Sequence, residues 1–372
     1  MSQALEDIVV VDMAGTVSTT YCAKLFADYG ATVVNVEPSA GFPTRGLAPL
    51  LDTQGGGSAM HAYLNANKHS VCVDQLSPAA LAALLARADL VLHDGAVDAV
   101  QAASLSMHVS WYGSTGPYAE YVGSDALCFA LNGMLRTIGH AEGPPLIPTG
   151  YQAQMVGGMT AFIGAMAQVL ARTLRTDLAA LHLETSIFES MLCFTEVGTI
   201  GFYNTGLEGH RMGINRFPPT YPLGVFPCKD GWIGLTVLTP SQWHTFCVLL
   251  DMPQFSQVAL FQTAVGRLEA ADMLEPLIAE KLLTLSAEEL FYRAQNAAVP
   301  LARVPTMEEL FQVDQFVQRQ AFAEVEVDGG RKVMAPTIAF RLFSTPPRLG
   351  GVVAALGAHT FLYQSEGASS GE

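Results

Sequence analysis

Short apolar runs alternate with helix-like patterns at the start of the chain. Residues 8–12 are apolar up to a closing Asp12, which is typical of a strand buried in a parallel sheet. A helix is expected at 21–29, where Gly30 ends it, and the next strand at 31–37. This order predicts an α/β fold with a doubly wound sheet, although the first loop lacks the G-x-G-x-x-G fingerprint of dinucleotide binding.

Residues 148–172 form a proline turn followed by a long helical pattern rich in small residues. Gly157 and Gly158 fall in its first turns, where intrinsic helix propensity disfavours glycine. We therefore expect a backbone or a ligand to approach the helix closely there. Gln154 lies just before this pair, near the free N–H groups of the helix start, which favour negative charge and anions.

The pattern changes after a stretch at 205–222 that is rich in Gly and Pro. A hairpin is expected around 229–231, followed by three helices and then a further helix at 307–320. Alternating residues at 323–327 and 332–338 predict an antiparallel pair of strands. We therefore place a domain boundary within the Gly- and Pro-rich stretch.

The composition fits a cytoplasmic protein with a substantial core. Half of the 372 residues are apolar and 14% are charged, and the length favours two domains. The formal net charge of −15 argues against nucleic acid or an anionic membrane as a general partner, but a few cations suffice for a small anion. The six cysteines include no C-x-x-C, so we expect reduced thiols, and we expect no signal peptide, membrane span or metal site. The positive mean hydropathy favours an oligomer.

A set of short segments, spread over nearly the whole chain, carries a family signature. The segments are residues 25–31 with 36–38, 67–68, 110–118, Gly158 with Arg172, 221–226, 230–231 and 356–360. In their order and spacing they resemble the family III CoA-transferases, the group of formyl-CoA transferase, carnitine CoA-transferase and α-methylacyl-CoA racemase.

The resemblance implies a large Rossmann-like, CoA-binding domain built from both chain ends, at 1–200 and 322–372. A linker at 201–222 would lead to a smaller α/β domain at 223–321. The resemblance also implies a homodimer whose two chains interlock, and a heteromer with a related subunit is the alternative. We expect the tail after Gln364 to be disordered.

Gln154 occupies the position where the resemblance places the catalytic Asp of the transferases. In the family, that carboxylate attacks the acyl-CoA and carries the acyl group as a mixed anhydride, which requires an anionic oxygen. A neutral amide is a very poor nucleophile. The His of the racemases falls on Ser124 and their Glu near Pro240, so the racemase pattern has lost its ionisable groups. We expect Ser124 and Asp125 to cap a helix, with Asp125 as a candidate replacement carboxylate.

Coenzyme A or an acyl-CoA is the ligand that the resemblance implies. The residues expected to contact it are Val17, Ser18, Asn67, Lys68, Asp94 and Arg136. The turn at residues 18–20 lacks its usual proline, and Asp94 begins a segment where the family has Asn–aromatic–Arg. That change removes a stacking side chain and a positive charge, while Lys68 and Arg136 remain as cations for the phosphates. We therefore expect weakened or altered CoA binding.

Three hypotheses about function remain open. In the first, the chain is an acyl-CoA enzyme that works without the aspartyl anhydride, with Gln154 and Ser124 holding the thioester carbonyl by hydrogen bonds. Alternatively, it is a non-catalytic subunit or CoA-binding partner of a heteromeric transferase, in which Gln154 is a remnant of lost catalysis. In the third, it is an active transferase or racemase that uses another carboxylate, such as Asp125.

Overall fold

The structure is a computed structural model that describes residues 2–52, 57–95, 103–175 and 179–364. The chain forms two compact units, each with its own core. The first unit comprises Met1–Met134, Ile147–Asn204 and Val313–Glu372, and the second comprises Leu135–Leu146 and Thr205–Gln312. The predicted division into a CoA-binding domain and a small α/β domain stays a prediction, and the expected disordered tail after Gln364 lies outside the described residues.

A six-stranded parallel sheet lies at the centre of the first unit, in the order β3-β2-β1-β4-β5-β6. Its strands are β1 Val9–Asp12, β2 Thr32–Glu37, β3 His69–Cys72, β4 Leu90–His93, β5 Leu105–Ser110 and β6 Leu181–Ser186. The predicted α/β fold with a parallel sheet is confirmed. The strand order reverses between β1 and β4, and ligands of open parallel sheets usually bind outside the carboxyl ends of the strands at such a point.

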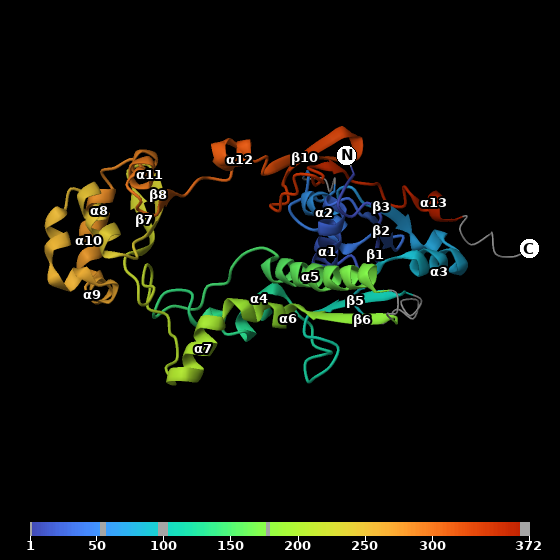
Figure 1. The fold of residues 1–372 in the computed structure, drawn as a ribbon, viewed down its shortest axis with the longest axis horizontal. Coiled ribbons are helices and arrows are strands. Elements are labelled where there is room, and N and C mark those ends of the chain that lie inside the picture. Colours follow the sequence, from blue (N-terminus) through green and yellow to red (C-terminus); the bar gives the residue numbers. More distant parts are fainter. Residues whose placement is uncertain (1, 53–56, 96–102, 176–178, 365–372) are drawn as a thin grey trace, which may run out of the picture. The chain divides into compact units, whose positions relative to one another are not determined.

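The helices of the first unit alternate with the strands or follow them along the chain, and α1 and α5 pack against the sheet (Figure 1). They are α1 Val17–Asp28, α2 Ala59–Asn65, α3 Pro78–Arg87, α4 Asp125–Leu131, α5 Gln152–Leu174, α6 Ile187–Ser190 and α7 Glu196–Thr205. Helix α1 begins at Val17 rather than at residue 21, because Thr16 caps it by accepting a hydrogen bond from the backbone N–H of Thr19. Helix α4 is short and ends at Leu131.

Helix α5 packs closely against α1 at its glycine pair (Figure 1). A Cβ placed on Gly158 would lie 2.6 Å from the backbone oxygen of Ser18, and one on Gly157 would lie 2.8 Å from the Ile187 side chain. The expected close approach of a backbone is therefore confirmed. Further along α5, Ala161 and Ala165 are fully buried, so small side chains form the helix face that meets the rest of the unit.

Helix α5 is also long and apolar enough to cross a membrane, judged by length and composition alone. The core helix of a soluble protein meets the same criterion, and α5 packs on α1 and on the sheet strands β5 and β6. This single helix is therefore weak evidence for a membrane span.

The end of the chain returns to the first unit. Strands β10 Phe322–Val327 and β11 Arg331–Pro336 form the predicted antiparallel pair, and β12 Gly351–Val352 pairs with β10. Helix α13 Thr360–Gln364 follows, and Tyr363 on it contacts Nδ1 of His69 through its hydroxyl at 2.7 Å. The expected helix at 307–320 is wrong in extent, because only a short turn and α12 Asp314–Gln318 form there.

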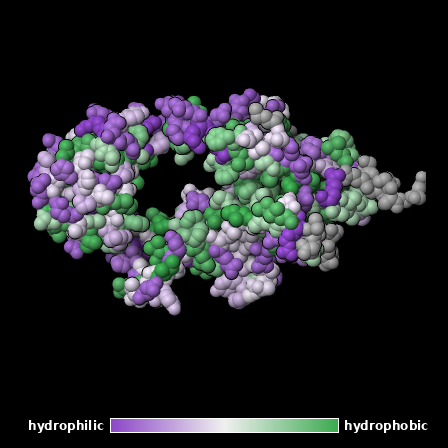
Figure 2. Space-filling view, viewed as in Figure 1, coloured by the Kyte–Doolittle hydropathy of each residue, from purple (hydrophilic) through white to green (hydrophobic). Residues whose placement is uncertain are grey.

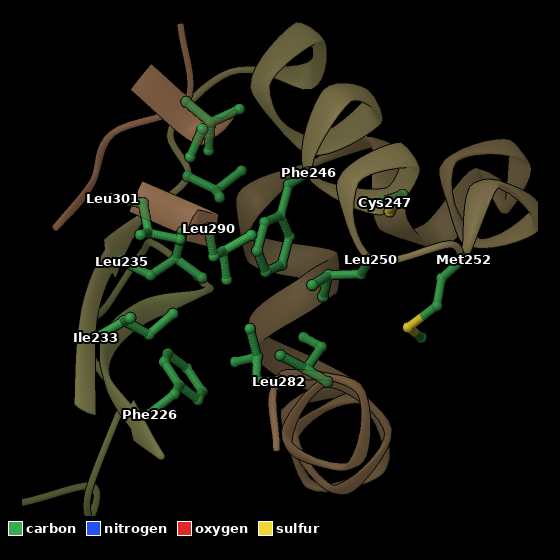
Figure 3. Close-up of a cluster of buried hydrophobic side chains, with 14 of the residues drawn as sticks. Phe226, Ile233, Leu235, Phe246, Cys247, Leu250, Met252, Leu282, Leu290 and Leu301 are labelled. Carbon is green, nitrogen blue, oxygen red and sulfur yellow. The ribbon is translucent and has the colours of Figure 1, made fainter. Parts of the chain in front are cut away.

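The second unit has a three-stranded antiparallel sheet covered by helices. Its elements are β7 Leu223–Cys228, β8 Gly231–Thr236, β9 Leu301–Arg303, α8 Pro240–Leu249, α9 Ala264–Glu269, α10 Ala271–Leu282 and α11 Ala287–Asn296. The predicted hairpin at 229–231 is confirmed as the turn between β7 and β8. Figure 3 shows Phe226 and Ile233 from the sheet pointing toward Phe246 and Leu282 from the helices, which fill the core.

Candidate functional site

Gln154 lies in the first turn of α5, and the carboxylate of Asp125 contacts it there. Oδ1 of Asp125 accepts a hydrogen bond from the backbone N–H of Gln154 at 3.2 Å, and Oδ2 accepts one from Nε2 of Gln154 at 2.9 Å. The N-cap residue of α5 is Tyr151, and its side chain makes no capping hydrogen bond to the described residues of the helix. Asp125 therefore satisfies a free N–H group of α5 and places a negative charge at the positive end of the helix dipole.

Helix α4 presents Asp125 to α5. Ser124 is the N-cap of α4, since its hydroxyl accepts a hydrogen bond from the backbone N–H of Leu127 at 3.3 Å. The predicted capping role of Ser124 is confirmed, and it fixes Asp125 in the first turn. The structure thus brings together the three residues for which a catalytic role was considered, Ser124, Asp125 and Gln154.

The hydrogen bond between the two side chains fixes the orientation of the Gln154 amide. A carboxylate can only accept hydrogen bonds, so the NH₂ group of Gln154 must face Asp125, and Oε1 faces away from it. The amide cannot attack a thioester as a carboxylate does. It can still direct a hydrogen-bonding group toward a substrate, because its second N–H and its Oε1 are not used in this contact.

Asp12, at the carboxyl end of β1, organises the loop into α1. Its Oδ1 accepts hydrogen bonds from the backbone N–H groups of Ala14 and Gly15 at 3.1 and 3.2 Å, and its Oδ2 accepts one from the Thr20 hydroxyl at 3.3 Å. Burial raises the pKa of Asp12, while the charge of Lys68 lowers it. The carboxylate therefore has a structural role at the point where the strand order reverses.

Lys68 is buried, with 3% of its surface exposed. Its Nζ donates to the carbonyl oxygen of Thr20 at 2.8 Å and to Oδ1 of Asn65 at 3.3 Å. Burial lowers the pKa of Lys68 to about 7, and the nearby charge of Asp12 raises it. These contacts give the ammonium group a structural role inside the unit, so phosphate binding by Lys68 stays a prediction that this geometry does not favour.

The structure places the other expected CoA contacts on several different elements. Val17 and Ser18 are buried in the first turn of α1. Asn67 has a positive φ of 63°, and its Nδ2 donates to the carbonyl oxygen of Gly350. Asp94 is exposed after the end of β4, and Arg136 belongs to the second unit. Their roles toward CoA stay predictions.

Two buried polar groups near β2 were not expected from the sequence. Arg45 forms a double hydrogen bond with Glu37, at 2.7 and 2.8 Å, and Ser70 donates to the same carboxylate at 2.6 Å. Burial alone would raise the pKa of Glu37, but these hydrogen bonds lower it overall.

The second group is His61, which contacts the Thr44 hydroxyl and the Asn65 amide through Nδ1. Because the amide can only donate there, Nε2 of His61 carries the proton, and burial lowers its pKa to about 3.

These pairs escape a reading of the sequence because the partners are separated along the chain and share no motif. Within residues 2–52, 57–95, 103–175 and 179–364, no group of three His, Cys, Asp or Glu side chains is arranged to hold a metal ion.

Comparison with known proteins assigns the chain to a family. The sequence model of CoA-transferase family III matches residues 5–360. The chain belongs to this family. Among curated members, the succinyl-CoA–L-malate CoA-transferase alpha subunit of Chloroflexus aurantiacus is 24% identical. The alignment, 382 residues long with its gaps, covers 96% of this chain and 87% of the relative. The beta subunit of that enzyme is 23% identical, with coverage of 96% and 92%.

The fold is also that of a solved family structure. The crystal structure of a CAIB/BAIF family protein from Brucella suis superimposes with a TM-score of 0.85 at 20% identity, covering 99% of this chain and all of the other. Membership of this family implies CoA thioesters as the substrate class.

Proposed function

We propose that this protein binds an acyl-CoA and acts on it without forming an aspartyl anhydride at position 154. The observation that carries the proposal is the amide of Gln154 at the start of α5, held by Asp125 at 2.9 Å. In the usual route, a carboxylate oxygen bonds to the thioester carbonyl, the C–S bond breaks and CoA leaves as a thiolate. An amide cannot complete this exchange, because its oxygen carries no full negative charge.

The second hydrogen-bonding edge of Gln154 supports a role in holding the thioester. A donor aimed at the carbonyl oxygen stabilises the charge that develops there when the thioester is attacked. A substrate that was bound in this way would transfer its acyl group directly to an acceptor or to a partner subunit. The relatives named for succinyl-CoA and malate support a dicarboxylic substrate for this chain as well.

Trapping with hydroxylamine tests the proposal. The purified chain is incubated with succinyl-CoA, and enzymatic formation of succinyl hydroxamate is measured above the uncatalysed rate. We expect none from the wild-type chain, because no acyl-enzyme anhydride accumulates. Clear turnover by the wild-type chain, at a rate that does not depend on the hydroxylamine concentration, would require an acyl-enzyme and contradict the proposal.

Asp125 supports a second candidate function, an active transferase with a displaced nucleophile. Its Oδ2 lies 2.9 Å from Nε2 of Gln154, so a carboxylate is present beside the position of the usual one. In this case hydroxamate would form with the wild-type chain and be lost in Asp125→Asn. The same carboxylate already accepts the backbone N–H of Gln154, so we rank the capping role first.

The function also depends on which chain this protein associates with. The α and β subunits named among the relatives support a heteromer in which another chain supplies the nucleophile. Exposed apolar side chains on α5 and α7 support association with a second chain in general, and we retain the interlocked homodimer as the alternative. Co-purification of a related chain with Asp at this position would favour the heteromer.

A further inference from the structure

A hollow of about 490 Å³ in the second unit is lined by two arginines. Residues 135–146 and 205–212, which are distant in sequence, meet to form it. The lining residues are Arg136, Ala141, Glu142, His210, Arg211 and Met212. This volume lies in the range of small-molecule sites, and the basic lining contrasts with the formal net charge of −15 on the whole chain.

Arg211 is the fixed cation of the hollow. Its Nε donates to the carbonyl oxygen of His140 at 3.0 Å, and its Nη2 donates to that of Gly143 at 3.0 Å. These two bonds hold the guanidinium in one place, because both carbonyls belong to the same tight turn. Among the described residues, no carboxylate lies within ion-pair distance of Arg211, and its Nη1 has no hydrogen-bond partner. The charge is therefore positioned but not neutralised.

Arg136 is the second cation of the hollow, and a ligand can displace its acidic partner. It contacts Glu208 at 3.2 Å, with the two side chains 67% and 70% exposed. Exposed pairs of this kind contribute little to stability, because water screens both charges. A ligand carboxylate can therefore replace Glu208 at little cost in free energy.

We propose that this hollow binds a small carboxylate through Arg136 and Arg211. The planar guanidinium fork matches the two oxygens of a carboxylate. The neighbouring Glu142 and Glu208 would repel a more highly charged phosphate more strongly, so a carboxylate fits the local charges better. The inference rests on the proposed function for the source of the carboxylate, which is either a free acid or the distal end of a dicarboxylic acyl-CoA.

Calorimetry on the full chain tests the site with succinate, and with succinamide as a neutral probe of similar size. We expect succinate to bind and succinamide not to bind. Arg136→Gln should weaken succinate binding by about tenfold or more, the range for a hydrogen bond to a charged group. Glu208→Gln should tighten binding, because it removes the competing carboxylate.

Arg293→Gln is the matched control, since Arg293 forms a similar exposed pair with Glu289 on α11. It should leave succinate binding unchanged. Equal succinate affinity in the wild-type chain and Arg136→Gln, or equal binding of succinamide and succinate, would overturn the inference. So would a Glu208→Gln variant that binds more weakly, or an equal loss in Arg293→Gln.

Two thioesters then identify the source of the carboxylate. If Arg136→Gln weakens succinyl-CoA but not acetyl-CoA, the site takes the acyl end; if it weakens only free succinate, the site takes a free acid. Equal weakening of both thioesters, with succinate unchanged, would assign Arg136 to CoA itself and overturn the inference. Hydroxamate turnover by the wild-type chain would contradict the proposed function but leave these binding results intact, so the two failures are distinguishable.

Discussion

At the scale of single residues, we propose that the amide at position 154 sets the chemistry that this chain can perform. Gln154 lies at the start of a helix, as a nucleophile there would, and Asp125 accepts two hydrogen bonds from it. That residue 154 takes the place of the family carboxylate is a prediction from the sequence, which rests on its spacing to Gly158 and Arg172. The sequence could not reveal the contact with Asp125, which depends on how α4 and α5 pack.

The variant Gln154→Asp should gain hydroxylamine-dependent acyl transfer from succinyl-CoA. The change restores an anionic oxygen at the start of α5, where the helix dipole favours it. The matched control is Gln152→Asp, an exposed position in the same helical turn, which should remain inactive. If Gln154→Asp is as inactive as the control, the amide at position 154 is not what prevents acyl transfer, and the proposed role of this residue is wrong.

Buried His61 should make the fold less stable at acid pH. Its folded pKa is about 3, whereas an unfolded imidazole titrates near 6.5. The unfolded chain therefore takes up the proton first, so the contribution is complete above pH 6.5 and is lost as the pH falls toward 3. At about 1.4 kcal/mol per pKa unit, His61 accounts for a loss of about 2 kcal/mol between pH 7 and pH 5.

Urea denaturation of the wild-type chain and of His61→Gln at both pH values measures this contribution. The other histidines are common to the two proteins, so the difference between their pH dependences isolates His61. Between pH 7 and pH 5, the variant should lose about 2 kcal/mol less of its free energy of unfolding than the wild-type chain does. Parallel pH profiles would show that His61 does not titrate differently on folding.

At the scale of elements, the contact between α1 and α5 holds the start of α5 in place. The sequence indicated this contact through Gly157 and Gly158, because glycine in an early helical turn needs a packing reason. It misplaced the start of α1, because the Thr16 cap lies in a run of small polar residues without periodicity. It also missed Arg45, whose partner Glu37 lies across a segment rich in Gly and Pro.

Adding one methyl group at Gly158 should destabilise the fold by about 1–3 kcal/mol, as for other overpacked core positions. The new Cβ would lie 2.6 Å from a backbone oxygen of α1, which cannot move away like a flexible side chain. Gly164→Ala on the same helix is the control, since its Cβ would make an ordinary 3.5 Å contact with Met107. It should be neutral or stabilising, because alanine favours a helix. Thermal denaturation in which both variants behave alike would contradict this packing.

At the scale of the whole molecule, the first unit exposes apolar helix surface that a monomer would leave in water. Exposed fractions are 68% for Ile163, 57% for Leu170 and 77% for Leu174 on α5, and 78% for Val197 and 89% for Tyr203 on α7. Figure 2 shows hydrophobic surface over the part of this unit where α4 and α5 lie. Such patches mark interfaces between proteins. The sequence predicted association from its positive mean hydropathy, but it could not show which surface is involved.

Light scattering on the purified chain should give about twice the 39.6 kDa of one copy if the partner is a second copy. Ile163→Asp should shift the mass toward one copy or cause aggregation, because it places a charge in the apolar surface. Tyr292→Asp makes a similar change at an exposed side chain of α11 in the other unit and should leave the mass unchanged. A wild-type mass of one copy would contradict the homodimer.

The central claim is that neither Gln154 nor Asp125 carries the acyl group, and peptide mass spectrometry tests this claim most directly. The wild-type chain is treated with succinyl-CoA and hydroxylamine and digested, and the peptides that contain Asp125 and Gln154 are examined for succinyl or hydroxamate adducts. We predict that both peptides remain unmodified, while Gln154→Asp becomes modified at residue 154. An adduct on Asp125 in the wild-type chain would contradict the account and identify Asp125 as the nucleophile.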